Sequence, residues 1–469
     1  MSVLAPESRR TQPPAGLPPQ ATRRPVWRRL IDLFSSLRLT VLLLALSIVV
    51  VFFGTLAQTE DGLYVAQDKY FRSVFSVWSP HDPAWKWVMV PLPGGYLLGV
   101  LLLINLLAAH ATRFKFTWKK AGIFLTHLGV IMLLVGQLAT DMFARESRMR
   151  FAEGESRSFT EDFHKVELAV LTDAAQPGAE NVVAFPESRL RAGATLQASE
   201  LPFTLRVQEF MPNSDPEIRR PSSADPTSGS TNVAGRNSGG SASETSWDGI
   251  ARRFEFTPQP LTREMDSKNI PTALVEAVGS DGQVLGRWAL TAWAGDADMA
   301  NVLFVTWMRS FQKQGDPAPF VRARRLVDEM TAPQTLEVAG KTYTLVLRPE
   351  RYYQPFALDL QRVTHETYQG TDTPKNFQSR VRIDNFRTGE KREVDIYMNN
   401  PLRYDGLTFF QHQMDASTMN LDGRPVTVFQ VVKNPSWLAP YAGTLVVGLG
   451  LIVQFSIHLV GFTRKRKAP

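Results

Sequence analysis

The sequence predicts a membrane protein with four transmembrane α-helices and a large, mainly antiparallel β domain outside the membrane. The apolar residues are bunched into four stretches without Asp, Glu, Lys or Arg, and a long hydrophilic segment separates the third stretch from the fourth. The basic residues, in addition, fit only one orientation of four crossings. A length of 469 residues would also suit two or three soluble domains, so hydropathy decides the class.

Residues 1–38 form a basic tail that ends in an amphipathic segment. The stretch PVWRRLIDLFSSLRL places Trp27, Leu30, Ile31 and Phe34 at helical spacing among arginines, which is typical of a helix lying in the membrane interface. The apolar run that follows is too long for the core of a cleaved signal peptide, and more than thirty residues precede it. We therefore expect it to stay in the protein as an anchor.

The four apolar stretches have the length of membrane spans, which is roughly 17 to 25 residues. The predicted spans are residues 39–57, 95–112, 121–140 and 438–463. The first two are joined by a short loop rich in aromatic residues and prolines, as expected at the outer membrane interface. A basic tail of residues 464–469 follows the last span.

The formal charge of +7 is distributed in a way that orients these spans. Residues 1–38 carry +5, the link RFKFTWKK carries +4 and RKRK near the end carries +4, so the rest of the chain is acidic. Four crossings put all three basic clusters in the cytoplasm and residues 141–437 outside. We therefore expect a multi-pass membrane protein with its large domain outside the cytoplasm and both termini inside it. The basic residues then face membrane lipid, and no nucleic-acid partner is expected.

Residues 141–437 are predicted to form the mainly antiparallel β domain. Short stretches with alternating apolar residues, such as KVELAVL, TALVEAV and VTVFQVV, are separated by glycine-containing turns. One helix is expected near residues 294–314. Residues 212–249 are rich in Ser, Gly, Asn and Pro, with too little apolar surface to offset the entropy of ordering, and are predicted to be a flexible insertion.

The chain has no cysteine, which excludes thiol nucleophiles, Fe–S clusters and cysteine-ligated metals. It also lacks a P-loop, a dinucleotide-binding glycine motif after a strand, HExxH and GxSxG in a credible context. The sequence therefore singles out no catalytic residue and argues against a familiar self-contained enzyme.

Three of the seven histidines lie at membrane depth, namely His110, His127 and His458. Counted from the basic residue at the cytoplasmic end of each span, His127 lies about 10 Å deep, His458 about 9 Å and His110 about 5 Å, at about 1.5 Å per residue. All three belong to the inner leaflet. His110 is shallow enough to be read as an interfacial residue.

The third span has two different faces. Small residues that allow close helix packing form one stripe, and they are Gly122, Thr126, Gly129, Gly136 and Thr140. His127 points away from this stripe toward an apolar face. Two interpretations stay open for it: a neutral histidine hydrogen-bonded to a neighbouring helix, or an axial ligand to haem iron. The same two stay open for His458.

Four segments together resemble one known family. They are LFSSLRLTVLLLALSIVVVFFGT in the first span, THLGVIMLLVG in the third, FALDLQRVTHETYQGTDTPKNFQSRVRI, and MNNPLRYDGLTFFQHQMD at residues 398–415. Their order, and the arrangement of three spans, an exported domain and a fourth span, resembles the ResB family of cytochrome c biogenesis proteins. The resemblance covers most of the chain outside the N-terminal tail and the Ser/Gly-rich insertion.

The resemblance implies a system II complex of the bacterial inner membrane, with the large domain in the periplasm and both termini in the cytoplasm. In this complex ResB and a multi-span partner, ResC or CcsA, carry haem b across the membrane and attach it to the CxxCH of apocytochrome c. His127 is similar to the third-span histidine that shares a transmembrane haem with a histidine of the partner. The implied role is an assembly subunit of a cytochrome c haem lyase complex, with the bond-forming chemistry mainly on the partner. His365 and His412 are read as ordinary surface or core histidines.

A second function also stays open from the residues alone. The chain would then be a self-contained b-type haem protein for electron transfer in the membrane. Its haem would lie between His127 and His458, whose estimated depths match.

Overall fold

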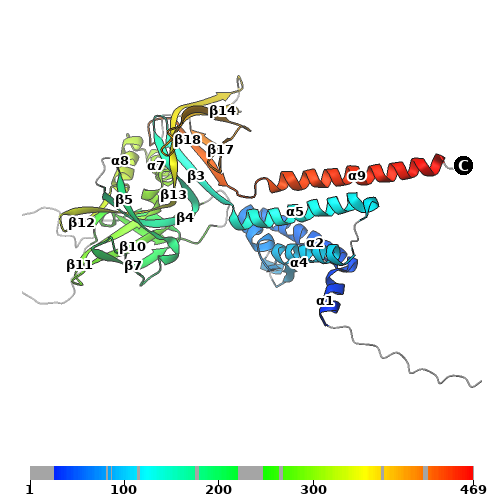
Figure 1. The fold of residues 1–469 in the computed structure, drawn as a ribbon. Coiled ribbons are helices and arrows are strands. Elements are labelled where there is room, and N and C mark those ends of the chain that lie inside the picture. The colour runs from blue at the N-terminus through cyan, green and yellow to red at the C-terminus, as the bar shows by residue number, and fades with distance from the viewer. Residues whose placement is uncertain are drawn as a thin grey trace, which may run out of the picture. The chain divides into compact units, whose positions relative to one another are not determined.

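The computed structural model describes residues 26–80, 83–85, 87–113, 117–174, 179–219, 247–262, 268–370, 374–415 and 421–467. The chain divides into two compact units. The membrane unit draws on Met1–Ala57, Gln67–Val135 and Pro440–Pro469, and the β-rich unit draws on Gln58–Ala66 and Gly136–Ala439. Among the described residues, four helices are long and apolar enough to cross a membrane, so the predicted fold class is confirmed (Figure 1).

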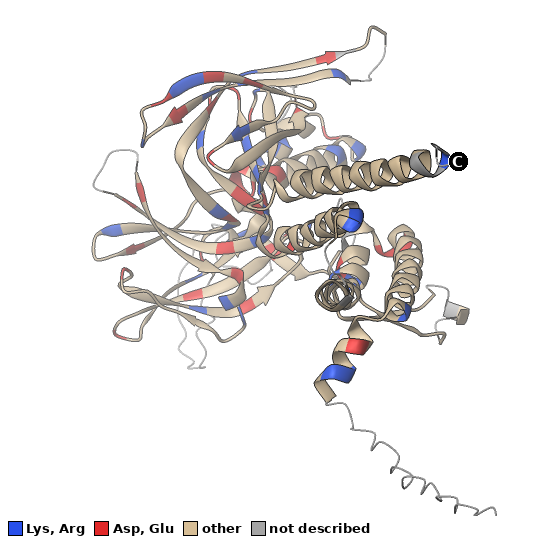
Figure 2. Cartoon of the chain, turned by 45° about the vertical axis from the view of Figure 1, so that its right-hand side comes forward, with Lys and Arg blue, Asp and Glu red and all other residues tan. Residues whose placement is uncertain are grey.

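The long helices are α2 (Leu37–Asp61), α4 (Gly95–Arg113), α5 (Ala121–Phe143) and α9 (Ala439–Lys467), and α1 (Val26–Phe34) precedes them. Short elements fill the connections: α3 (Leu63–Ala66), the π-helical turn η1 (Gln67–Phe71), β1 (Phe75–Trp78), η2 (Pro83–Trp85), β2 (Val90–Pro93) and η3 (Trp118–Lys120). Figure 2 shows the long helices almost without charge, whereas both signs are interspersed over the β-rich unit. The loop expected between the first two spans contains an antiparallel hairpin, β1 with β2.

Asn105 of α4 holds the bend between α1 and α2. Its side chain is buried, and its Nδ2 donates to the carbonyl oxygens of Phe34, at 2.5 Å, and Ser36, at 3.3 Å. Its Oδ1 accepts a hydrogen bond of 2.6 Å from the hydroxyl of Thr40. Carbonyls at a helix end lack partners within the helix, and Asn105 supplies one. The predicted amphipathic helix α1 thus leaves the bundle at a fixed point, with Trp27 exposed.

The small-residue stripe of α5 packs against α9, which runs antiparallel to it. Gly122 lies against Gln454, and a Cβ on Gly129 would come within 2.6 Å of Val447 Cγ2. Likewise, a Cβ on Gly450 would lie 2.5 Å from the backbone nitrogen of Thr126. The close helix contact predicted from the stripe is therefore present, and α9 is its partner.

The β-rich unit contains a ten-stranded antiparallel sheet in the order β15-β14-β13-β4-β3-β18-β17-β16, with β12 added to β13 and β5 to β4. Its strands are β3 (Arg145–Ala152), β4 (Ser156–Asp173), β5 (Glu180–Pro186), β12 (Gln334–Val338), β13 (Lys341–Thr367), β14 (Pro374–Asn385), β15 (Lys391–Tyr397), β16 (Leu402–Tyr404), β17 (Leu407–Asp415) and β18 (Val426–Lys433). The alternating stretches read from the sequence are strands, as predicted.

Two smaller sheets complete the unit. A four-stranded sheet has the order β11-β10-β7-β6, and β8 pairs with β9. These strands are β6 (Thr195–Leu196), β7 (Phe203–Met211), β8 (Ser214–Ile218), β9 (Phe254–Pro258), β10 (Thr272–Gly279) and β11 (Val284–Thr291), with the 3-10 turns η4 (Glu187–Arg189) and η5 (Gly249–Arg252) nearby.

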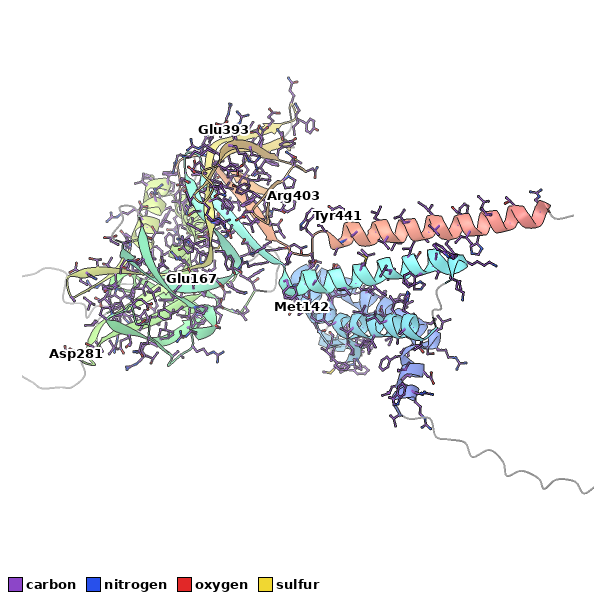
Figure 3. The ribbon with its side chains drawn as sticks, in the orientation of Figure 1. Met142, Glu167, Asp281, Glu393, Arg403 and Tyr441 are labelled. Carbon is purple, nitrogen blue, oxygen red and sulfur yellow. The ribbon has the colours of Figure 1, made fainter. Side chains whose placement is uncertain are left out.

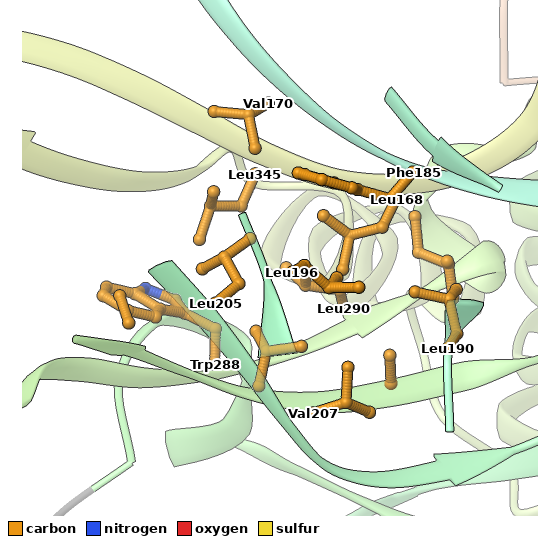
Figure 4. Close-up of a cluster of buried hydrophobic side chains, with 14 of the residues drawn as sticks. Leu168, Val170, Phe185, Leu190, Leu196, Leu205, Val207, Trp288, Leu290 and Leu345 are labelled. Atoms are coloured by element: carbon orange, nitrogen blue, oxygen red, sulfur yellow. The ribbon is translucent and has the colours of Figure 1, made fainter. Parts of the chain in front are cut away.

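The long strand β13 takes part in two separate cores. Its first half packs against the four-stranded sheet, where Leu345 joins Leu168, Leu205 and Trp288 (Figure 4). Its second half faces the curled part of the large sheet, where Phe356 joins a second cluster with β17 and β18. One strand thereby ties both cores together.

The helical part of this unit differs from the sequence prediction. One helix was expected at residues 294–314, whereas the structure has α6 (Ala292–Gly295), α7 (Ala297–Lys313) and α8 (Pro319–Met330). Residues of α8 are buried with helical spacing, and they are Ala323, Leu326, Val327 and Met330. Three arginines and two acidic residues lie among these positions and obscured the helical period in the sequence, although proline is a usual residue at a helix start.

The predicted flexible insertion at residues 212–249 is wrong at both ends. Ser214–Ile218 forms β8, and the buried Ser214 hydroxyl bonds to Thr272 at 2.8 Å. At the other end, Trp247 packs on the core around α7, and η5 begins at Gly249. Tertiary pairing with β9 therefore orders residues whose composition is typical of loops. Residues 220–246 lie outside the described part of the chain.

Candidate functional site

His127 lies on α5, six residues after its first residue, on the side away from the contact with α9. The glycine stripe faces α9, so the half-buried imidazole occupies the other face, as the sequence predicted. Its Nδ1 is 2.8 Å from the carbonyl oxygen of Ile123, one turn earlier. A polar side chain at membrane depth is thus oriented by its own helix.

This hydrogen bond defines the tautomer of His127. A carbonyl oxygen can only accept, so Nδ1 must carry a hydrogen, and in the neutral form of the ring the lone pair is then on Nε2. Nε2 of a neutral imidazole is a standard metal ligand, and a backbone carbonyl on Nδ1 is the usual orienting partner for such a ligand. The residue therefore fits the role of an axial ligand to haem iron.

His110 of α4 lies beside His127, which the sequence reasoning did not predict. The ring centroids are 5.4 Å apart with planes tilted by 52°, and His110 also contacts the ring of Phe124 at 5.4 Å. The two imidazoles are in direct contact, which leaves no thickness for a porphyrin between them. The sequence did contain a signal for this pair. The second and third spans are joined by a short link, and both histidines lie within two helical turns of it, so they can be expected to face each other.

His458 of α9 has a different environment. Its ring is exposed, and Nε2 is 2.8 Å from Nε2 of Gln454, one turn earlier. Thr126, next to His127, contacts Gly450, whereas His458 lies eight residues beyond Gly450, about 12 Å along the helix. The register of α5 against α9 therefore places His127 and His458 at different positions along the helix axes. The depths estimated from the flanking basic residues had been nearly equal.

The β-rich unit carries a buried cluster of charges that the sequence did not reveal. Arg148 Nη2 lies 2.5 Å from Asp296, Lys268 Nζ lies 2.5 Å from the same carboxylate, and Arg148 Nη1 lies 2.5 Å from Asp298. Arg150 extends the cluster to Asp298, at 2.7 Å, and to Asp422. Three cations thus meet three anions, joining β3 to the start of α7.

The pKa values in this cluster follow from burial and pairing. Burial alone would raise the pKa of Asp296, but the charges of Arg148 and Lys268 outweigh it and hold that pKa below its ordinary value. For Lys268, burial outweighs the attraction of Asp296 and lowers its pKa. Asp296 also caps α7 by accepting from the Asp298 amide. Because the charges balance, we interpret the cluster as a structural clamp.

A groove of about 450 Å³ lies next to this cluster. Arg150, Asp298 and Asn301 line one side, and Phe377 with the end of β17 lines the other. His412 lies at its rim and is exposed, and His365 stacks on Phe377 with ring centroids 4.7 Å apart. Within the described ranges, no three His, Asp or Glu side chains are grouped so that they could hold a metal ion.

The four long apolar helices and the mainly antiparallel β domain together define a membrane protein with a large β-rich part outside the membrane. Residues 316–422, which run from the turn before α8 to just beyond β17, match the model of the ResB-like family. The resemblance to the ResB family is therefore confirmed over this segment of the chain.

A curated relative supports the same family. The chain is similar to Protein NrfI of Wolinella succinogenes, with 29% identity over 119 residues, which is 25% of this chain. The matched part covers 12% of the length of that protein. The similarity therefore concerns a segment and not the whole of the relative.

Proposed function

We propose that this chain is a subunit of the membrane complex that delivers haem across the membrane and attaches it to apocytochrome c. The role in cytochrome c biogenesis is supported by the ResB-like match of residues 316–422 and by the similarity to NrfI. In this proposal the partner is a ResC- or CcsA-like multi-span protein, which performs the bond-forming chemistry. The chain itself contributes a haem ligand and an outer docking domain.

His127 carries the proposal. Its Nδ1 donates to the Ile123 carbonyl, so the lone pair is on Nε2, and the face of α5 that it occupies is not the face covered by α9. The His127 imidazole would hold the iron of a bound haem, and the haem would supply the metal centre of the site. The tautomer of His127 is set before haem arrives, and His110, in ring contact, limits the rotation of the imidazole.

The orientation of the protein is part of the proposal. Three basic clusters flank the membrane spans, and the positive-inside rule puts both termini in the cytoplasm and the β-rich unit in the periplasm. His127 then lies on the cytoplasmic half of its span, the side from which haem enters. The β-rich unit is on the side where apocytochrome c is exported.

The test is a haem spectrum of the full chain purified together with its multi-span partner. The wild-type complex is expected to show a low-spin axial signature, and His127→Ala is expected to lose it. His127→Gly should regain the signature when free imidazole is added, because the small side chain leaves room for the exogenous ligand. His412→Ala, in the exposed rim of the β-rich unit, serves as the control and should leave the spectrum unchanged.

The same experiment separates this proposal from a self-contained b-type haem protein. No contact joins His127 to His458 among the described residues, so His458→Ala is expected to leave the spectrum unchanged. Stoichiometric bis-histidine haem in the chain expressed without a partner, lost on His458→Ala, would instead support the b-type protein. An unchanged axial signature in His127→Ala would rule out the ligand role.

A further inference from the structure

One end of the ten-stranded sheet carries both connections to the long helices α5 and α9. Strand β3 begins two residues after the end of α5, and residues 434–438 lead from strand β18 into α9. The hydroxyl of Thr140 lies 2.7 Å from that of Ser436, which ties the two connections together. This end of the sheet therefore lies at the height where two apolar helices leave the bilayer.

The strand register brings six strand ends together there. Arg145 of β3 pairs with Lys433 of β18, which also pairs with Leu407 of β17. Leu407 in turn pairs with Tyr404 of β16. The Tyr404 hydroxyl accepts a hydrogen bond of 2.8 Å from the last residue of β14 and donates one of 2.8 Å to the residue before β15. The turns between these strands are far apart in the sequence and close together at the membrane side.

This end of the sheet exposes large aromatic side chains. Phe143 is 62% exposed, Trp437 is 47% exposed, and Phe386, in the turn between β14 and β15, is 64% exposed. Phe143 and Trp437 adjoin the apolar helices in the sequence. Phe386 is distant from both helices in the sequence and reaches this end only through the fold. Exposed aromatic rings at this height are typical of the belt at a membrane surface.

Three cations at the same end form no ion pair within the described ranges, and they are Arg145, Arg403 and Lys433. The guanidinium of Arg145 lies 3.7 Å from the centre of the Tyr352 ring, and that of Arg403 lies 5.3 Å from the centre of the Trp437 ring. Arg145 and Lys433 are directly opposite each other on neighbouring strands, where like charges are destabilising. A bound anion would remove this repulsion.

Two acidic side chains at this end are engaged elsewhere. Asp405 lies 3.4 Å from Arg387. Glu146 follows Arg145 in β3 and therefore points to the other face of the sheet, where it accepts a hydrogen bond of 3.4 Å from Gln430. The chain outside its three basic clusters is acidic overall, so cations collected at one end without a carboxylate indicate an anionic ligand.

We propose that this end of the β-rich unit binds the anionic headgroups of phospholipids in the adjacent leaflet. The lipid-facing patch consists of Phe143, Phe386, Trp437, Arg145, Arg403 and Lys433, all of which belong to the β-rich unit. Lipid is the occupant because two spans enter the bilayer beside the patch, so headgroups lie at its height. The cations pair with lipid phosphates, and the rings enter the layer between headgroups and acyl chains. This inference goes beyond the proposed function and does not depend on haem.

The position of Phe386 is tested with a spin label in the full chain in nanodiscs. The chain has no cysteine, so one introduced cysteine can carry the label. The label at Phe386→Cys should be more accessible to oxygen, which concentrates in lipid, than to a neutral water-soluble nickel chelate. Asp281→Cys is the control and should show the reverse, because Figure 3 shows Asp281 on the side of the β-rich unit opposite to Met142 and Arg403. Equal nickel accessibility at both positions would overturn the proposal.

The role of the cations is tested with the same label at position 386. Replacing part of the phosphatidylcholine by phosphatidylglycerol should raise the ratio of oxygen to nickel accessibility at least about twofold, because anionic lipid attracts cations near the membrane surface. Arg145→Gln, Arg403→Gln and Lys433→Gln together should abolish this rise. The matched control combines Arg191→Gln, Arg309→Gln and Lys341→Gln, which removes the same charge from exposed positions outside the patch, and should keep the rise.

Two further outcomes would contradict the proposal. A similar response of both triple variants to phosphatidylglycerol would show that the patch does not select anionic lipid. Inorganic phosphate in excess over the lipid headgroups should leave the ratio unchanged, since it lacks acyl chains. Loss of the rise on addition of phosphate would instead indicate a site for a free anion.

Discussion

The two units of this protein bury polar side chains in opposite ways. In the membrane unit, the buried Asn105 and the half-buried His127 bond to backbone carbonyls and a hydroxyl, and these contacts are neutral. In the β-rich unit, Arg148, Lys268 and Asp296 are nearly inaccessible, and both cations form ion pairs with Asp296. A bilayer penalises ions strongly, whereas a soluble core tolerates them when every charge has a partner.

This difference indicates which buried polar groups have a structural role and which could bind a ligand. A charge cluster in which three cations are paired with three anions is neutral as a whole, so its main effect is to hold β3 and the start of α7 together. His127 is instead oriented through Nδ1, and imidazole is a ligand type that binds metals. The sharper functional hypothesis therefore belongs to His127, although the β-rich unit has far more polar contacts.

The largest expected effect is loss of stability when the charge cluster is broken. Asp296→Asn preserves size but leaves Arg148 and Lys268 without their shared anion, and buried unpaired charge costs about 3–5 kcal/mol. Unfolding of the full chain, followed by tryptophan fluorescence in denaturant, measures this cost. Asp395→Asn, whose partner Arg380 is half exposed, is the control and should cost less than about 1 kcal/mol.

Lowering the pH is a second way to disrupt the charge cluster, because it protonates Asp296. The folded pKa of Asp296 is below its unfolded value of about 4, so its stabilisation is complete above that value and is lost as the pH falls through the folded pKa. Acid unfolding of the wild type should therefore steepen below about pH 4. Asp296→Asn should lack this component. Parallel acid curves for the two proteins would contradict the assignment of Asp296 as a stabilising anion.

Local pattern made much of this fold predictable. The four spans follow from apolar length, and the strands around KVELAVL and VTVFQVV follow from alternation, because each signal is contained in consecutive residues. Ser214–Ile218 was misread as part of a flexible insertion, since its order comes from pairing with a strand some forty residues away. Helix α8 was missed because charged residues flank its buried positions.

The candidate site was predictable only in part, for the same reason. His127 was found because a lone imidazole in an apolar span is visible in one stretch of sequence. Its neighbour His110 and the register that separates it from His458 depend on how helices pair. The charge cluster joins residues 148, 268 and 296, so no local pattern could reveal it.

The packing of α5 against α9 should give an intermediate effect. Gly129→Leu places a side chain where Val447 and the backbone of α9 already lie, and overpacking of this kind costs about 1–3 kcal/mol. Unfolding of the full chain by titration with SDS measures the change. Gly448→Leu is the matched control on α9, because no atom lies within 4 Å of the Cβ it would add. Similar destabilisation by both variants would show that the close contact is not what stabilises the pair.

The smallest expected effect concerns the neutral contacts of Asn105. Asn105→Leu keeps the volume but removes the donor to the Phe34 carbonyl and the acceptor for Thr40, at a cost of about 1–2 kcal/mol. Amide hydrogen exchange in residues 26–40 should accelerate, while exchange in α9 stays unchanged, because the bend between α1 and α2 loses the hydrogen bonds that Asn105 of α4 makes to it. Thr40→Val removes one of these bonds and should show a smaller acceleration. If Asn105→Leu instead slowed exchange or left it unchanged, α1 would be held by its apolar face and the lipid interface, and neutral hydrogen bonds would matter as little in the membrane unit as exposed ion pairs do in the β-rich unit.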